Sequence, residues 1–208
     1  KLKLGKAPLF EPGLDDLLQA GIDQGRLHFH SNPSQALAGA EVLWVAFDTP
    51  VDDDDQADVA FVLDQVQLAL PHLVDGAVVL VSSQMPVGSV RKLEAFARQS
   101  LSGKKLEFAC SPENLRLGKA IEVFSNPDRI VVGVRTVRAR EVLQKLLAPI
   151  TDQVEWMSVE SAEMTKHAIN AFLATSVTFA NEIAAICELV GADAKEVERG
   201  LKTEARIG

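Results

Sequence analysis

The sequence predicts an α/β protein that contains part of a doubly wound sheet followed by a long-helix domain. Short aliphatic runs without polar alternation indicate strands that are covered on both faces. Helix-like stretches separate these runs, and such alternation is typical of βαβ units in a parallel sheet. Towards the C-terminus the strand–helix alternation ends, and one long stretch without Gly or Pro shows a helical period of apolar residues.

Runs of β-branched and aliphatic residues are the expected strands, and the last of them leads into the different region. The runs are Val42–Phe47, Ala77–Ser82, Leu106–Cys110, Arg129–Val134 and Val154–Val159. Helices are expected between them, at Asp58–Leu70, Val90–Ser100 and Val137–Leu147. The apolar share of 47% leaves enough material for a core on both faces of such a sheet.

The long stretch spans Ser161–Val190, and Gly191 is its expected stop signal. A second helix is expected at Ala194–Leu201. A helix of about 30 residues exceeds the usual globular length, so we expect it to bridge domains or to form a subunit contact. Its apolar positions share one broad arc, formed by Met164, Ala168, Phe172, Thr175, Phe179, Ile183 and Ile186.

Charge and composition argue against several classes of protein. A net charge of −8 without clustered Lys and Arg disfavours nucleic-acid binding. Cys110 and Cys187 lack a metal or redox motif, so we expect buried reduced thiols in a reducing cytoplasm. No apolar run approaches the roughly 18–20 residues of a membrane span, and no signal peptide is visible. The acidic run Asp52–Asp55 is expected in a solvated loop without a metal.

A polar arc of the long helix carries the first candidate site. Glu163, Lys166, Asn170 and Asn181 lie within about 60° of one another on a regular helix, facing away from the apolar arc. Lys166 and Asn170 would direct a cation and an amide to one spot, where they could stabilise an oxyanion and hold a water. An ordinary solvated helix face is the alternative that the spacing leaves open.

Loops that follow the expected strands carry the other candidates, because ligands of open α/β sheets bind beyond the carboxyl ends of strands. In Ser111–Gly118, Glu113 could act as a general base or hold a water. Phe47–Pro50 and Ser82–Ser89 could contact the ribose or nicotinamide amide of a cofactor. The alternatives are a helix N-terminus that begins with Pro112, and simple turns.

Taken in order, the motifs of the chain resemble those of the UDP-glucose/GDP-mannose dehydrogenase family, and the resemblance covers essentially the whole chain. The motifs are F-E-P-G-L (Phe10–Leu14), D-T-P (Asp48–Pro50), M-P-V-G-S (Met85–Ser89), S-P-E-N-L-R-L-G (Ser111–Gly118), P-D-R-I-V-V-G (Pro127–Gly133), A-E-M-T-K-H-A-I-N-A-F-L-A (Ala162–Ala174), N-E-I (Asn181–Ile183) and R-I-G (Arg206–Gly208). Their order is specific for the family and says little about the sugar.

The resemblance implies an NAD-dependent enzyme that oxidises the C6 alcohol of a nucleotide sugar, UDP-glucose foremost, to the uronic acid. It further implies an enzyme of polysaccharide biosynthesis that forms a homodimer through the 161–190 helix. Together with the composition, this leads us to expect a cytoplasmic protein that binds neither membrane nor metal. The implied domains are a Rossmann-like NAD-binding domain at 1–158, without its first βαβ segment, and a truncated central dimerisation domain at 159–208.

Two sets of ligand residues follow from the resemblance. The NAD set is Thr49, Pro50, Ser83 and Gln84. The substrate set is Glu113, Asn114, Leu115, Arg116, Leu117, Lys166, Asn170 and Arg206. Within it, Glu113 would assist the hydrolytic step, Lys166 would stabilise developing oxyanions, and Asn170 would position a water or the sugar oxygen. Arg206 would reach the substrate of a neighbouring subunit.

The chain departs from the family pattern at several of these positions. Gln84 replaces a threonine that helps to hold the catalytic water, and Leu117 replaces a second glutamate. Asn114 and His167 stand where the family has phenylalanine and tyrosine. The chain contains no G-x-G-x-x-G loop, and the nucleophilic cysteine of the family is expected beyond Gly208. We therefore expect a truncated chain that is inactive by itself.

Two alternatives to this interpretation differ in testable ways. Dehydrogenases of the 6-phosphogluconate or β-hydroxyacid type also place an asparagine four residues after a helix lysine. They have glycines before that lysine, where this chain has Ser161–Met164. The second alternative is a non-catalytic module that dimerises through the 161–190 helix. NAD reduction with a panel of nucleotide sugars distinguishes all three.

Overall fold

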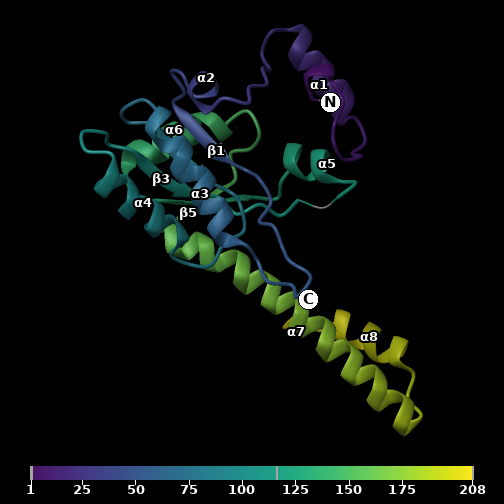
Figure 1. Cartoon of the computed structure of the whole chain (residues 1–208). Helices are drawn as coiled ribbons and strands as arrows, with labels where there is room; N and C mark the ends of the chain where they lie inside the picture. The colour runs from purple at the N-terminus through teal and green to yellow at the C-terminus, as the bar shows by residue number, and fades with distance from the viewer. Residues whose placement is uncertain (1, 116, 208) are drawn as a thin grey trace. The chain divides into compact units, whose positions relative to one another are not determined.

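The computed structural model describes residues 2–115 and 117–207 and confirms the α/β class (Figure 1). The chain separates into two compact units, Lys1–Met164 and Thr165–Gly208; the boundary expected after residue 158 stays a prediction. The strands are β1 (Val42–Val45), β2 (Val78–Val81), β3 (Glu107–Cys110), β4 (Ile130–Val134) and β5 (Val154–Met157). The helices are η1 (Leu2–Leu4), α1 (Leu14–Asp23), α2 (Pro33–Ala36), α3 (Val59–Ala69), η2 (Leu70–His72), α4 (Ser89–Ser100), α5 (Ala120–Ser125), α6 (Val137–Leu147), α7 (Val159–Val190) and α8 (Ala194–Lys202).

Within the described residues, the strands form one five-stranded sheet in the order β1-β2-β3-β4-β5. β1, β2 and β3 are parallel, with Val42 opposite Val78 and Val78 opposite Glu107. β4 runs antiparallel to β3 and parallel to β5. The expectation of parallel strands throughout is therefore wrong at β4. The chain leaves the carboxyl end of β3, forms α5 and enters β4 without crossing back, so the strand direction reverses.

Both faces of the sheet are covered, which explains the apolar runs of its central strands. Helices α3 and α4 and the first turn of α7 share one hydrophobic cluster with β2, in which Val62, Leu93 and Val159 are fully buried. Helix α6 covers the other face, where Leu143 and Leu80 belong to the same cluster. Burial of each such side chain contributes about 1.5–3 kcal/mol before the entropy of folding is subtracted.

Side-chain caps explain where two of the expected helices begin. The Asp58 carboxylate accepts a hydrogen bond from the Phe61 N–H at 2.9 Å, so α3 starts one residue later. The Thr136 hydroxyl accepts one from the Ala139 N–H at 3.1 Å, and α6 has the bounds that the sequence predicts. In both cases a polar residue directly precedes an apolar helical period, which is the signal that sequence reasoning uses.

The long helix is α7, and Gly191 follows it in the left-handed conformation with a φ of 74°. The long helix and its stop signal are thus confirmed. Several of its apolar side chains are exposed, among them Phe172 and Leu189. By length and composition α7 could cross a membrane, although one such helix is weak evidence. The expectation that no apolar run reaches this length is wrong, because Ala, Ser and Thr join the aliphatic residues into a window with few charges.

The first turn of α7 packs directly onto β4 at Gly133. A Cβ added at Gly133 would lie 2.7 Å from the Ala162 Cβ, from the Ser158 carbonyl oxygen and from the Val159 Cα. Carbon atoms in contact are normally about 3.5–4.0 Å apart. The sequence motif that ends in Gly133 therefore has a packing reason: a residue without a side chain lets the helix approach the strand closely.

Candidate active site

A cavity of about 830 Å³ opens at the carboxyl ends of β1, β2 and β3. Its walls come from the loops after these strands, from α5 and from the segment that leads into β4. Its size falls within the roughly 300–1,000 Å³ of small-molecule sites, and ligands of open α/β sheets bind at this edge. Residues of the expected cofactor and substrate sets that line it are Ser83, Gln84, Glu113, Asn114, Leu115 and Leu117. Arg116, which belongs to the same set, lies outside the described residues.

The loops after β1 and β2 are tied to each other by two hydrogen bonds. The Thr49 hydroxyl donates to the Gln84 carbonyl oxygen at 2.7 Å, and the Ser83 hydroxyl donates to the Phe47 carbonyl oxygen at 2.5 Å. Thr49 is 7% exposed, whereas Pro50 is exposed, and neither is among the described residues that line the cavity. Thr49 therefore supports the loop that carries Gln84; direct contact of Thr49 and Pro50 with a cofactor stays a prediction.

A chain of hydrogen bonds crosses the strand ends beneath the cavity. The Trp44 indole N–H donates to the Ser82 hydroxyl at 2.8 Å, and Ser82 donates to the Ser111 carbonyl oxygen at 2.6 Å. The Ser111 hydroxyl in turn donates to the Val131 carbonyl oxygen at 3.0 Å. The Trp44 ring also lies 6.0 Å from the ring of Phe124 in α5, measured between centroids. Sequence reasoning missed this chain, because Trp44 looked like one more apolar strand residue.

Glu113 sits at the tip of the loop after β3. Its carboxylate is exposed, and Oε2 accepts a hydrogen bond from the Leu115 N–H at 2.5 Å. The alternative that Pro112 begins a helix is wrong, since the next helix starts at Ala120. One carboxylate oxygen is thus held by the loop, and the exposed group has room for a water or a substrate hydroxyl.

The F-E-P-G-L motif near the start of the chain contacts this same loop. Glu11 accepts hydrogen bonds from the Gly118 N–H at 2.7 Å and from the Ile121 N–H at 3.3 Å. Gly118 has a φ of 82°, and Lys119 at the start of α5 provides no side-chain cap. Because α5 lines the cavity, Glu11 fixes one of its walls. Two motifs that are far apart in sequence therefore belong to one structural unit.

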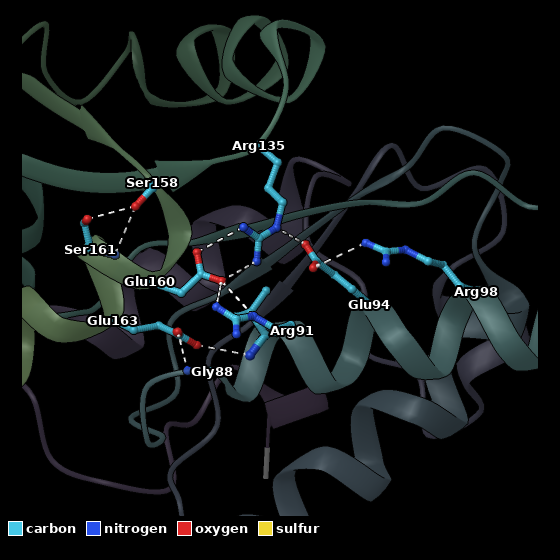
Figure 2. A network of polar contacts seen from close by, with 10 residues as sticks. Gly88, Arg91, Glu94, Arg98, Arg135, Ser158, Glu160, Ser161 and Glu163 are labelled. Atoms are coloured by element: carbon cyan, nitrogen blue, oxygen red, sulfur yellow. Dashed lines mark hydrogen bonds and ion pairs between the residues drawn. The ribbon is translucent and has the colours of Figure 1, made fainter.

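The start of α7 is joined to α4 and to the end of β4 by a polar network (Figure 2). Glu160 accepts hydrogen bonds from Arg91 at 2.7 Å and from Arg135 at 2.8 Å, and Arg135 also binds Glu94. The contact with Arg135 holds the pKa of Glu160 at about 2, well below its usual 4.5, and it raises the pKa of Arg135. Both groups therefore remain charged, and the network links three elements around neutral pH.

Glu163 is not on a solvated helix face. The side chain is 6% exposed, and it accepts hydrogen bonds from the backbone N–H groups of Gly88 and Val90 at 2.7 and 3.1 Å. It thus lies at the N-terminus of α4. The alternative of an ordinary solvated helix face is therefore wrong for Glu163, because the first turn of α7 is buried against the sheet.

Lys166, Asn170 and Arg206 belong to the second compact unit. Lys166 is half-buried and Asn170 is exposed, one helical turn further along α7. Arg206 is exposed, and its Nε donates to the Glu204 carboxylate at 2.8 Å. The shared helix face of Lys166 and Asn170 follows from their spacing. Their proximity to Glu113 stays a prediction, and so does the reach of Arg206 to a neighbouring subunit.

The surroundings of the two cysteines do not favour a catalytic role. Both are free and buried, as expected. Burial raises the pKa of the Cys110 thiol to about 12, and the nearby charge of Glu163 adds to the increase. A thiol with this pKa is protonated at neutral pH and is a poor nucleophile. The Asp52–Asp55 run lies in an exposed loop, where Asp52 accepts hydrogen bonds from backbone N–H groups.

Comparison with known proteins agrees with this arrangement. The chain is 36% identical to the UDP-glucose 6-dehydrogenase of Pseudomonas aeruginosa and 38% identical to that of Rhizobium meliloti, covering 100% of this chain and 48% and 49% of those proteins. It superposes on the UDP-glucose dehydrogenase structure from Pyrobaculum islandicum with a TM-score of 0.88 at 30% identity, covering 100% of this chain and 49% of that one.

The similarity covers nearly all of this chain but only part of each relative. The chain spans about half the length of the curated relatives that it matches. Residues 1–151 match the NAD binding domain of one family, and residues 160–208 match the central domain of the same family. The chain therefore belongs to the UDP-glucose/GDP-mannose dehydrogenase family.

Proposed function

We propose that this chain is part of an enzyme that oxidises the C6 alcohol of a nucleotide sugar, UDP-glucose foremost, to the uronic acid with NAD as the oxidant. The observation that carries the proposal is the cavity at the strand ends. Residues expected to bind the cofactor and residues expected to bind the sugar line the same space, although they come from different loops. Family membership supplies the reaction type.

The residues present fit the nicotinamide end of NAD. The Ser83 hydroxyl and the Gln84 amide stand at the carboxyl end of β2, beside apolar lining from Trp44 and Phe47. An amide and a hydroxyl can bind the carboxamide and ribose of the cofactor, and an apolar wall can hold the ring. When bound there, NAD would accept the hydride. The loops that carry these residues are fixed to each other, so the site is formed before ligand binds.

The sugar would lie against the loop after β3, from Glu113 to Leu117. The exposed Glu113 carboxylate can accept a proton from a water that cleaves a covalent intermediate. Lys166 would stabilise the oxyanions that develop during oxidation, and Asn170 would hold the water or the sugar oxygen. Arg206 would extend to the substrate of a neighbouring subunit. Leu117 stands where the family has a second glutamate. Among the described residues of this loop, Glu113 is therefore the one that brings a carboxylate to the cavity.

The assembly that we propose is a cytoplasmic homodimer formed through α7. Large side chains of this helix are exposed, among them Phe172 at 72%, and a second copy would remove them from water. An obligate interface should bury roughly 2,000 Å² or more. Phe172→Asp should then shift the protein from dimer to monomer in sedimentation at tens of micromolar. Leu68→Asp, at an exposed position of α3, is the matched control and should leave the dimer intact. A wild-type monomer under these conditions would refute the assembly.

The function is tested by NADH formation in the complete enzyme that contains this chain. The substrates are UDP-glucose, GDP-mannose, a UDP-N-acetyl sugar and 6-phosphogluconate. Oxidation of an alcohol to a carboxylate removes two hydrides, so two NADH should form per nucleotide sugar consumed. Turnover of 6-phosphogluconate alone would favour the competing dehydrogenase type, and no turnover of any substrate would favour a dimerisation module. The isolated 208-residue chain should show no steady-state turnover.

A further inference from the structure

The N-terminus of α4 is capped by a residue from another helix. Gly88 is its N-cap residue, has a φ of 92° and offers no side-chain acceptor. Glu163 of α7 supplies the missing acceptor. One of its carboxylate oxygens binds the Gly88 N–H at 2.7 Å and the other binds the Val90 N–H at 3.1 Å (Figure 2). Both oxygens of a buried carboxylate are therefore used to hold the first turn of α4.

This cap stands at one end of the loop that is proposed to hold the cofactor. The loop runs from Ser82 to Gly88, between β2 and α4. At its start, the bonds from Ser83 to Phe47 and from Thr49 to Gln84 attach it to the neighbouring loop. At its far end Glu163 holds the backbone. The loop is thus fixed at both ends, and its far end depends on one side chain of α7.

The Glu163 carboxylate occupies a position where a ligand phosphate could otherwise bind. The N-terminus of a helix that follows a strand is where α/β proteins bind ligand phosphates, because its N–H groups are unpaired and partly positive. At the start of α4, the Gly88 and Val90 N–H groups are already bound by a carboxylate of the protein itself, and the Ser89 N–H binds the Pro86 carbonyl oxygen. A phosphate would have to displace a buried negative charge, so the contribution of α4 to cofactor binding lies in its loop.

We propose that Glu163 is a positioning residue for cofactor binding: it sets the conformation of the Ser82–Gly88 loop from α7 without touching the cofactor. This inference rests on the proposed NAD-dependent function. Its consequence is that the helix that carries Lys166 also determines the shape of the cofactor loop. Loss of the Glu163 cap should loosen the loop and weaken NAD binding while leaving the nucleotide-sugar site intact.

A matched control separates this role from general stability. Glu160 lies one turn earlier on α7 and anchors the helix through side chains, to Arg91 and Arg135, without a contact to the loop. Glu160→Gln should lower the melting temperature and leave the KM for NAD at the wild-type value. Glu163→Gln keeps the size of the side chain but replaces one acceptor oxygen by an NH2 group, which cannot accept a hydrogen bond.

The experiment compares both variants in the complete enzyme. For Glu163→Gln we expect the KM for NAD to rise about tenfold, which corresponds to about 1.4 kcal/mol, the scale of one hydrogen bond to a charged group. The KM for the nucleotide sugar at saturating NAD should stay within about twofold of wild type. Amide hydrogen exchange at Gly88 should accelerate in the Glu163 variant alone. If Glu163→Gln does not fold, Glu163→Asp replaces it, with a carboxylate too short to reach both N–H groups and an expected rise of about threefold.

The outcomes distinguish the inference from the function on which it rests. Equal KM values for NAD in the Glu163 and Glu160 variants, in an active enzyme, overturn the positioning role and leave the function in place. A wild-type enzyme that reduces no NAD with any nucleotide sugar overturns the function, and the positioning role falls with it.

Discussion

Alanine at position 133 should destabilise the sheet unit, because Gly133 lies directly under the first turn of α7. The added Cβ would stand 2.7 Å from three atoms, and two of these belong to the backbone of Ser158 and Val159. Backbone atoms cannot rotate away as a side chain does. The helix or the strand must therefore move by about 1 Å to restore normal contact.

The cost of this movement can be estimated from overpacked cores, in which one extra methyl group destabilises by about 1–3 kcal/mol. A unit of this size loses roughly 2–4 °C in melting temperature per kcal/mol, so Gly133→Ala should melt about 2–12 °C below wild type. Thermal unfolding followed by circular dichroism measures the shift, and urea unfolding gives the free energy. The movement of the helix should also disturb the Glu163 cap, since Glu163 directly follows Ala162, one of the residues that contact Gly133.

A second glycine provides the control with the opposite sign. A Cβ added at Gly200 in α8 would meet no atom within 4 Å. Gly200→Ala should therefore stabilise slightly, by up to about 1 kcal/mol, because alanine has the higher helix propensity. A melting temperature of Gly133→Ala within about 1 °C of wild type would refute the close-packing argument.

Further predictions follow from single groups. The pKa of Glu160 is lowered from 4.5 to about 2 by Arg135, so its stabilisation is fully present above pH 4.5 and is lost as the pH falls towards 2. Glu160→Gln should accordingly be less stable than wild type at pH 7, with a difference in urea unfolding that closes across this range; a constant difference would contradict the assignment. Lys166→Ala in the complete enzyme should lower kcat about 10²–10³-fold with little change in substrate affinity, and near wild-type kcat would show that it stabilises no oxyanion. Glu11→Ala should raise the KM for the nucleotide sugar severalfold through the unsupported start of α5, while the KM for NAD stays constant. Because burial raises its pKa to about 12, Cys110 in the folded chain should resist iodoacetamide at neutral pH, as mass spectrometry of the labelled peptides would show.

Much of the fold could be predicted from the sequence, because buried positions produce a regular pattern of apolar residues. The runs that contain Val78–Val81 and Ile130–Val134 identify strands, and the caps before α3 and α6 mark helix starts. Burial carries no record of strand direction, however, so the reversal at β4 could not be read from its residues. Likewise, the small residues Ala, Ser and Thr between the large aliphatic ones along α7 concealed how few charges the helix has.

The candidate site was predictable where position after a strand was sufficient. Ser83, Gln84 and Glu113 follow strands that end at one edge of the sheet, and they line one cavity. The partners of Glu11 and Glu163 were not predictable, because both carboxylates bind backbone N–H groups that no residue type marks. Helical spacing placed Glu163 on the same face as Lys166. In the structure the first turn of α7 packs against the sheet, and the Glu163 side chain is buried at the N-terminus of α4.

The reversal at β4 also determines how the sheet is held together. In the described register β3 and β4 share the pairs Ala109–Val134 and Cys110–Gly133, whereas β1 with β2 and β4 with β5 each share four. The boundary between β3 and β4 therefore has the fewest main-chain pairs among the described strands. Side chains add to this pairing, through the hydrogen bond from the Ser111 hydroxyl to the Val131 carbonyl oxygen and the one from the Thr136 hydroxyl to the Glu107 carboxylate. Cooperativity between the two halves of the sheet therefore depends partly on these side chains, and substitution of Ser111 or Thr136 should let each half open more independently in hydrogen exchange.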